Sequence, residues 1–208
     1  AIDVDALIDP YLEAAIEALD GEAPLLTGMA RYHMGLVTPS FEPVNPGAID
    51  RGKRIRPLVA ILSCAAAGGD PADAAPLAAA IELLHNFTLI HDDIQDNDRE
   101  RRHRPTVWTI WGKAQAINAG TAMRILANVA LARLERDGIT IDKRCRVGER
   151  LDEITLKLIE GQYLDISYEE RFDITVKDYL MMIEGKTVAL LSGSMEIGAM
   201  LGTDNPEM

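Results

Sequence analysis

The sequence predicts an all-α protein. Apolar residues make up 48% of the chain but aromatic residues only 5%. Most of the apolar content is therefore Ala, Leu and Ile, which favours packed helices over sheets. No segment alternates apolar and polar residues over the length of a strand. A chain of 208 residues is long enough for one domain with a substantial core, so we expect a single helical domain over residues 1–208.

Glycine and proline divide the chain into the expected helices. Residues 39–52 contain prolines and glycines at short intervals and predict a loop. Pro57 suits the first turn of the helix that follows this loop. Pro76 leaves open whether the next helical segment is one helix or two. The helices are expected over residues 2–19, 28–37, 58–67, 72–96, 113–135, 142–168 and 176–200, with Gly138 separating the last two from the rest.

The composition excludes several classes of protein. A net charge of −12 argues against a nucleic-acid partner, since no general basic surface is present to neutralise phosphates. No apolar run reaches the roughly 20 residues of a transmembrane segment, and no basic and apolar leader opens the chain. Cys64 and Cys145 indicate neither a disulfide framework nor a zinc site. We therefore expect a soluble, cytoplasmic protein.

The segment 80–106 carries the strongest signal for chemistry. Its first part is too densely apolar for a surface helix, so we expect a helix that is buried on most sides. Polar residues on such a helix indicate a functional role. His85, Asp92 and Asp96 are spaced i, i+7 and i+11, which places them on one face of a helix, with Thr88 between them. This spacing predicts a polar stripe on a buried helix.

Asp92 and Asp96 lie one helical turn apart, whereas Asp93 points away from them. Carboxylates this close repel one another, and an Mg²⁺ ion shared with a substrate phosphate would relieve the repulsion. Arginines that could bind the same phosphate follow at once, at positions 99, 101, 102 and 104. The alternative is an acidic helix end that meets a solvated basic loop.

Because the overall charge is negative, any anion site must be built locally. A second basic cluster, Lys53–Arg54 with Arg56, precedes an apolar helix. Lys186 lies in an apolar helical segment and either binds an anionic partner or extends to the surface. The run Gly185–Lys186–Thr187 is not a P-loop, since Leu180 occupies the place of the required glycine. Gln162 and Asp165, three residues apart, are either part of a site or an ordinary interhelical pair.

Taken together, these motifs resemble those of the trans-isoprenyl diphosphate synthases, also called polyprenyl synthetases. They occur in the order expected for that family: Gly52–Lys53–Arg54–Ile55–Arg56–Pro57, Glu82–Leu83–Leu84–His85, Asp92–Asp93–Ile94–Gln95–Asp96 with Arg101–Arg102, Gly161–Gln162 with Asp165, and Gly185–Lys186–Thr187. The resemblance implies an isoprenoid-synthase-type helical bundle around a central cavity. It also implies a prenyltransferase that acts as a homodimer.

The resemblance assigns roles to individual residues. It implies that isopentenyl diphosphate is bound through its diphosphate, and that Mg²⁺ bridges Asp92 and Asp96 to the allylic diphosphate. Arg101 and Lys186 would contact the same allylic group, and Lys186, Thr187 and Gln162 would face the allylic cation. The residues that would grip isopentenyl diphosphate are Lys53, Arg56, His85 and Arg102.

The resemblance further implies a short-chain product. In this family the residues five and four places before the first aspartate help set product length, and here they are Phe87 and Thr88. A ring at the floor of the tunnel would stop the growing chain, which favours geranylgeranyl diphosphate, with farnesyl diphosphate next. The allylic partner would be dimethylallyl, geranyl or farnesyl diphosphate.

The chain departs from the family pattern in several places. The second aspartate-rich motif is absent, and C-terminal helices of the family are missing with it, after a loop expected over residues 198–206. Thr121 and His103 stand where the family often has aspartate and glycine. Two alternatives therefore stay open: a class I terpene cyclase, and a noncatalytic partner subunit of a prenyl diphosphate synthase.

Overall fold

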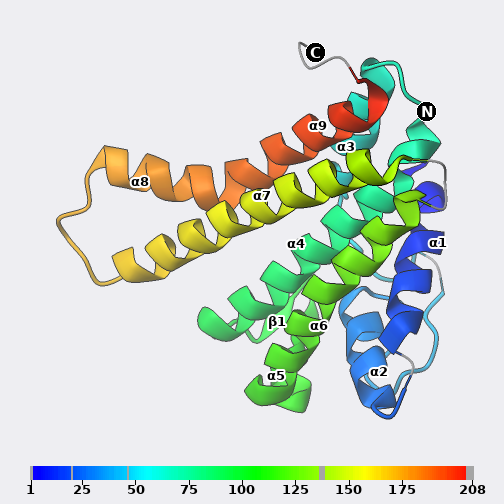
Figure 1. Ribbon diagram of the computed structural model, residues 1–208. Coiled ribbons are helices and arrows are strands. Elements are labelled where there is room, and N and C mark those ends of the chain that lie inside the picture. The colour runs from blue at the N-terminus through cyan, green and yellow to red at the C-terminus, as the bar shows by residue number, and fades with distance from the viewer. Residues whose placement is uncertain (1, 20, 46, 136–138, 205–208) are drawn as a thin grey trace. The chain divides into compact units, whose positions relative to one another are not determined.

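The computed structural model describes residues 2–19, 21–45, 47–135 and 139–204. It confirms the all-α prediction (Figure 1). The α-helices are α1 (Val4–Ile16), α2 (Pro24–His33), α3 (Ile55–Ala66), α4 (Ala75–Gln95), α5 (Val107–Trp111), α6 (Lys113–Leu131), α7 (Ile141–Tyr168), α8 (Val176–Ile183) and α9 (Ala189–Gly202). Short 3₁₀ helices are η1 (Glu17–Leu19), η2 (Pro71–Ala74) and η3 (Ala132–Glu135), and η4 (Glu184–Val188) is a π-helix.

Several sequence-based expectations need correction, among them the end of the second helix, which is His33 and not residue 37. The expectation of no strand was wrong in one place, where β1 (Glu100–Arg101) pairs antiparallel with β2 (Arg104–Pro105). The second helix begins at Pro24, four residues before the expected start, because proline is well suited to a first helical turn. The loop expected from residue 198 is helical as far as Gly202. The expected breaks at Gly138 and Pro206 lie outside the described residues.

The described residues form two compact units, and α3 and α4 each contribute to both. The first unit contains residues 1–55 and 79–133, and the second contains residues 56–78 and 134–208. Among the described residues, no helix is long and apolar enough to cross a membrane.

In the first unit, α1 and α2 pack on α6. Asp3 caps α1 by accepting a hydrogen bond from the backbone of Ala6 at 3.1 Å. The residues of α4 from Ala79 onward lie beside α6 (Figure 1), where a Cβ on Gly120 would lie 2.4 Å from the ring of His91. Fully buried side chains of the core include Ile8, Leu12, Ile16, Ile81, Leu84 and Met123.

In the second unit, α7 runs beside a continuous rod made of α8, η4 and α9 (Figure 1). Thr140 caps α7, and Thr175 begins α8 with a capping box to Asp178. The end of α9 packs tightly on α3, since a Cβ on Gly198 would lie 2.2 Å from the carbonyl oxygen of Ala60. Buried side chains of this core include Ile61, Leu77, Val147, Leu151, Ile154 and Ile197.

Candidate active site

The aspartates of the first unit lie on the last turn of α4 and just beyond it. The backbone N–H of Asp96 donates to the carbonyl of Asp92 at 2.8 Å, so the helical turn continues through both residues. Asp92 is half-buried and Asp96 is exposed. Asp93 points in another direction, with only 1% of its surface exposed. The structure therefore gives these three carboxylates different surroundings.

Asp93 is held by Arg101 of the β-hairpin. Arg101 Nε donates to Asp93 Oδ1 at 2.8 Å, and Arg101 Nη2 lies 2.7 Å from the same oxygen. Burial raises the pKa of Asp93, and the ion pair with Arg101 opposes this shift. Asp93 thus holds Arg101 in place. Asp92 and Asp96 lie one helical turn apart, as the sequence predicted.

The donors on α4 suit a hard divalent cation. Two carboxylates one turn apart provide oxygen ligands, which Mg²⁺ prefers, and Mg²⁺ commonly completes its shell with water and phosphate. Within the described part of the chain, no three His, Cys, Asp or Glu side chains are grouped to hold a metal by themselves. Asp92 and Asp96 would supply two oxygen ligands for a Mg²⁺ ion whose shell water and phosphate complete.

Two arginines of the hairpin, Arg101 and Arg104, donate hydrogen bonds to other elements of the first unit. Arg101 binds Asp93, and Arg104 Nη2 donates to the carbonyls of Tyr32 and Val37 at 2.9 and 3.2 Å. The guanidinium of Arg104 also lies 4.1 Å from the centroid of the Tyr32 ring. Arg102 is at the turn with φ of 51°, followed by His103 with φ of 60°. Positive φ at both central residues is the geometry of a type I′ turn, which usually favours asparagine and glycine.

Arg102 lies against the loop that carries Lys53. A Cβ on Gly52 would lie 2.5 Å from Arg102 Nη2, and Gly52 has φ of 84°. The left-handed backbone favours glycine at this position, because other residues rarely adopt it. Lys53 is exposed, so the first unit brings two of the predicted diphosphate ligands to neighbouring positions.

Sequence reasoning missed His33, which lines a cavity of about 20 Å³ beside the hairpin arginines. Its Nε2 atom is buried and has no hydrogen-bond partner among the described residues. Burial, together with repulsion from Arg101, Arg102, Arg104 and His85, lowers the pKa of His33 to about 3. No spacing in the sequence connects His33 with the hairpin.

The two residues predicted to set product length lie on α4. The ring of Phe87 packs edge-on against His91, with centroids 4.9 Å apart and an interplanar angle of 73°. Thr88 is buried, and its hydroxyl donates to the carbonyl of His85 at 2.7 Å. His85 itself is half-buried on the same helix.

The second unit contains Arg56, Gln162, Lys186 and Thr187. Lys186 Nζ forms an ion pair with Asp165. Of the two alternatives that the sequence left open for Lys186, the structure thus supports an anionic partner. Gln162 is buried on α7, Thr187 is exposed, and Arg56 is half-buried in the first turn of α3. Lys186 and Thr187 are in the π-helix η4, which is not the strand–loop–helix context of a P-loop.

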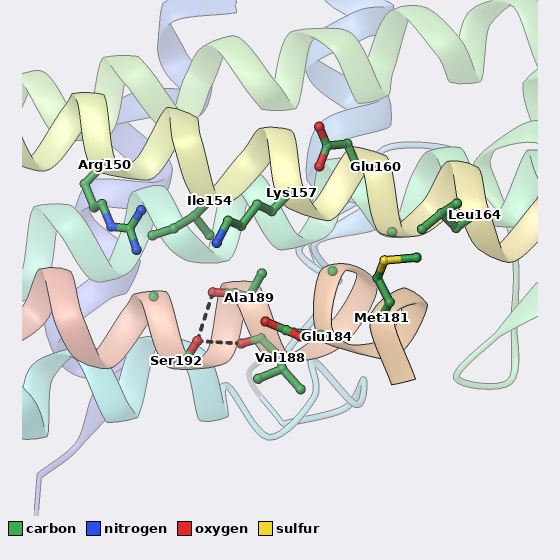
Figure 2. Close-up of a pocket in the computed structure, with 13 residues that line it drawn as sticks. Arg150, Ile154, Lys157, Glu160, Leu164, Met181, Glu184, Val188, Ala189 and Ser192 are labelled. Atoms are coloured by element: carbon green, nitrogen blue, oxygen red, sulfur yellow. Dashed lines mark hydrogen bonds between the residues drawn. The ribbon is translucent and has the colours of Figure 1, made fainter. Parts of the chain in front are cut away.

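An open groove of about 280 Å³ runs between α7 and the α8–α9 rod (Figure 2). Arg150, Lys157, Glu160 and Glu184 line it along with apolar side chains, as do Gly161 and Gly185. Ser192 also lines the groove, but its hydroxyl donates a hydrogen bond to the carbonyl of Val188 at 2.9 Å. None of the predicted site residues of the second unit lines this groove.

Comparison with known proteins gives a consistent result. Residues 42–208 match the family model described as polyprenyl synthetase. The chain is 42% identical over 195 residues to a (2E,6E)-farnesyl diphosphate synthase of Mycobacterium tuberculosis, covering 94% of this chain and 51% of that protein. It is 40% identical over 192 residues to a geranylgeranyl diphosphate synthase of the same organism, covering 92% of this chain and 52% of that protein.

A solved structure of a polyprenyl synthetase from Streptomyces coelicolor A3(2) superposes with a TM-score of 0.86 at 41% identity. The match covers 98% of this chain and 57% of the solved one. The chain therefore spans about half the length of the relatives that it matches.

Proposed function

We propose a function on the basis that this chain belongs to the polyprenyl synthetase family. It forms part of a Mg²⁺-dependent short-chain trans-prenyl diphosphate synthase. Such an enzyme condenses isopentenyl diphosphate with an allylic diphosphate. The observation that best supports this proposal is the identity to farnesyl and geranylgeranyl diphosphate synthases over more than nine-tenths of the chain. We further propose that residues 1–208 belong to one helical domain, which works in the cytoplasm as a homodimer.

Asp92 and Asp96 would hold the Mg²⁺. When bound, Mg²⁺ neutralises charge on the departing allylic diphosphate and so favours its release. The two carboxylates would hold the cation at the end of α4, where the negative end of the helix dipole would add to the attraction. Arg101 can bind the same diphosphate while paired with Asp93, because a guanidinium has more N–H donors than one carboxylate oxygen uses.

By the family resemblance, the residues that would bind the diphosphate of isopentenyl diphosphate are Lys53, Arg56, His85 and Arg102. Their charges compensate for the net charge of −12, which by itself repels a diphosphate. Once the allylic diphosphate departs, the double bond of isopentenyl diphosphate attacks the allylic carbon, and the adduct then loses a proton to the released diphosphate.

Lys186, Thr187 and Gln162 would act on the allylic group during ionisation. Lys186 supplies a positive charge for the departing diphosphate, and Asp165 orients that charge in the free protein. The amide oxygen of Gln162 and the hydroxyl oxygen of Thr187 supply dipoles that stabilise a cation without reacting with it. An apolar helical environment keeps water away from that cation.

Phe87 and Thr88 would limit the product to a short chain, with geranylgeranyl diphosphate favoured and farnesyl diphosphate next. The ring of Phe87 is supported by His91, so it resists displacement by the growing tail. Removing this ring would allow a longer product.

Release of inorganic diphosphate tests the proposed reaction, using protein from the full reading frame that contains this chain. With Mg²⁺, we expect release from geranyl or farnesyl diphosphate only when isopentenyl diphosphate is added. Release without isopentenyl diphosphate would instead support a terpene cyclase. No release under either condition, combined with binding to a separate synthase, would support a noncatalytic partner subunit.

A further inference from the structure

The N-terminal helix α1 holds the loop that carries Lys53. Arg54 follows Lys53 and is buried, with 3% of its side chain exposed. Arg54 Nη1 donates to Asp5 and, at 2.8 Å, to Asp9 Oδ1. A buried guanidinium is stable only where carboxylates or other acceptors compensate for its lost hydration. The position of Arg54 therefore depends on α1.

Asp9 is the central carboxylate of this arrangement. Its two oxygens accept a fork of hydrogen bonds from Arg51, at 2.9 Å to Oδ2 and 3.0 Å to Oδ1. Burial would raise the pKa of Asp9, but Arg51 and Arg54 outweigh burial and lower it. Asp5 is 62% exposed, against 34% for Asp9. Asp9 is thus an ionised side chain that binds two arginines at once.

The two arginines flank Gly52 and Lys53 in the sequence. Asp9 consequently fixes both ends of this two-residue segment, and we call Asp9, Arg51 and Arg54 the α1 clamp. The segment has an unusual backbone, with φ of 84° at Gly52 and 46° at Arg54. Such left-handed conformations persist where surrounding contacts fix them. The backbone of Gly52 in turn faces the guanidinium of Arg102.

We propose that Asp9 is a positioning residue for isopentenyl diphosphate, because through the α1 clamp it sets Lys53 and the Gly52 backbone relative to Arg102. This inference rests on the proposed function for the roles of Lys53 and Arg102. Asp9 itself precedes residues 42–208, over which the chain matches the family model. The α1 clamp thus joins a helix that precedes the matched residues to a loop that lies within them.

The test compares Asp9→Asn with Glu13→Gln in the protein from the full reading frame. Glu13 lies one turn further along α1, where it pairs with Arg31 at 3.4 Å, apart from the loop. Asp9→Asn should raise KM for isopentenyl diphosphate by about tenfold, with kcat and KM for the allylic diphosphate within about twofold. Asp9→Glu, which keeps the charge, should recover part of the loss, and Glu13→Gln should match the unchanged protein. Equal kinetic constants for Asp9→Asn and Glu13→Gln would overturn the proposal.

A double variant separates positioning from stability. Asp9→Asn with Arg54→Met removes the buried charge together with its partner, so the cost of an unpaired guanidinium disappears. If the α1 clamp positions Lys53, KM for isopentenyl diphosphate stays high in the double variant. If Asp9 serves only stability, the double variant regains the KM of the unchanged protein, and the proposal fails.

Hydrogen exchange tests the α1 clamp independently of turnover. Asp9→Asn should speed exchange of the Gly52 and Lys53 amides relative to Glu13→Gln, and unchanged exchange would overturn the clamp. If the protein without substitutions neither catalyses the reaction nor binds isopentenyl diphosphate, the proposed function is refuted. In that case the exchange result would still decide whether Asp9 orders the loop.

Discussion

Gly161 of α7 and Gly185 of η4 meet backbone to backbone. A Cβ on Gly161 would lie 2.1 Å from the backbone nitrogen of Lys186, and one on Gly185 would lie 2.8 Å from Gly161 Cα. Since a real Cβ does not approach backbone atoms so closely, neither position has room for a larger residue. This contact sets Lys186 beside Asp165 on the neighbouring helix.

Gly161→Ala should separate the two helices and displace Lys186. We expect a loss of about 1–3 kcal/mol in the free energy of unfolding, typical of overpacking at a tight contact, measured by urea denaturation. Glu160→Ala is the matched control, because Glu160 is the preceding, exposed residue of α7. Equal stability of the two variants would show that the helices can move apart without cost.

Lys186→Met should separate catalysis from stability. Lys186 and Asp165 are 28% and 33% exposed, so their pair contributes at most about 1 kcal/mol to folding. Loss of one cation from the departing diphosphate should lower kcat by about 10²-fold. Lys157→Met changes an exposed lysine of α7 and should leave kcat unchanged. A large loss of stability with little loss of kcat would contradict the proposed role of Lys186.

Asp92→Asn and Asp93→Asn should behave differently. Asp92→Asn removes a proposed Mg²⁺ ligand, so the Mg²⁺ concentration for half-maximal rate should rise and kcat should fall by about 10²-fold or more. Asp93→Asn weakens the hold on Arg101 and should change the Mg²⁺ requirement little. Rates measured over a series of Mg²⁺ concentrations check both, and chelation of Mg²⁺ should abolish turnover. The same Mg²⁺ dependence in both variants would argue against Asp92 as a ligand.

Phe87→Ala should lengthen the product, because it removes a ring that His91 supports from one side. Phe87→Tyr keeps the ring and should keep the product. Chromatography of the dephosphorylated products measures their lengths. An unchanged distribution for Phe87→Ala would rule out Phe87 as the limit on chain length.

His33 should make stability depend on pH. Its pKa is about 3 in the folded protein, against about 6.5 unfolded. As pH falls below 6.5, the unfolded chain binds a proton first, so stability present above pH 6.5 is lost progressively toward pH 3. Between pH 6.5 and 5 this loss amounts to at most about 2 kcal/mol, at about 1.4 kcal/mol per pH unit.

His33→Gln, which does not titrate, should show a smaller loss of stability over this range in urea denaturation. His103→Asn changes an exposed histidine of the hairpin and should keep the pH dependence of the unchanged protein. Identical pH profiles for all three proteins would place His33 in solvent.

The helices were largely predictable from the sequence, and the contacts between distant segments were not. Helical spacing predicted α4 and α7 to within a few residues, because long apolar patterns between glycine and proline breaks constrain them strongly. On α1, Leu7 and Ile8 are adjacent apolar residues, as are Tyr11 and Leu12, but only Ile8 and Leu12 are fully buried. A helix with apolar residues at adjacent positions does not specify which one faces the core.

At the candidate site, the sequence indicated the aspartates and the arginines, and it left open whether Lys186 has an anionic partner. It did not indicate that Asp93 binds Arg101 or that Asp9 binds Arg54, because both pairs depend on tertiary packing. The β-hairpin was also missed, since Arg102 and His103 are not typical residues of a type I′ turn. The roles proposed for the individual site residues remain predictions.

The proposed condensation is tested by the mass of the product formed from geranyl diphosphate and isopentenyl diphosphate in the presence of Mg²⁺. We predict a linear prenyl diphosphate extended by whole five-carbon units, with farnesyl or geranylgeranyl chains dominant. A product with the ten carbons of the primer, or no product at all, would contradict it.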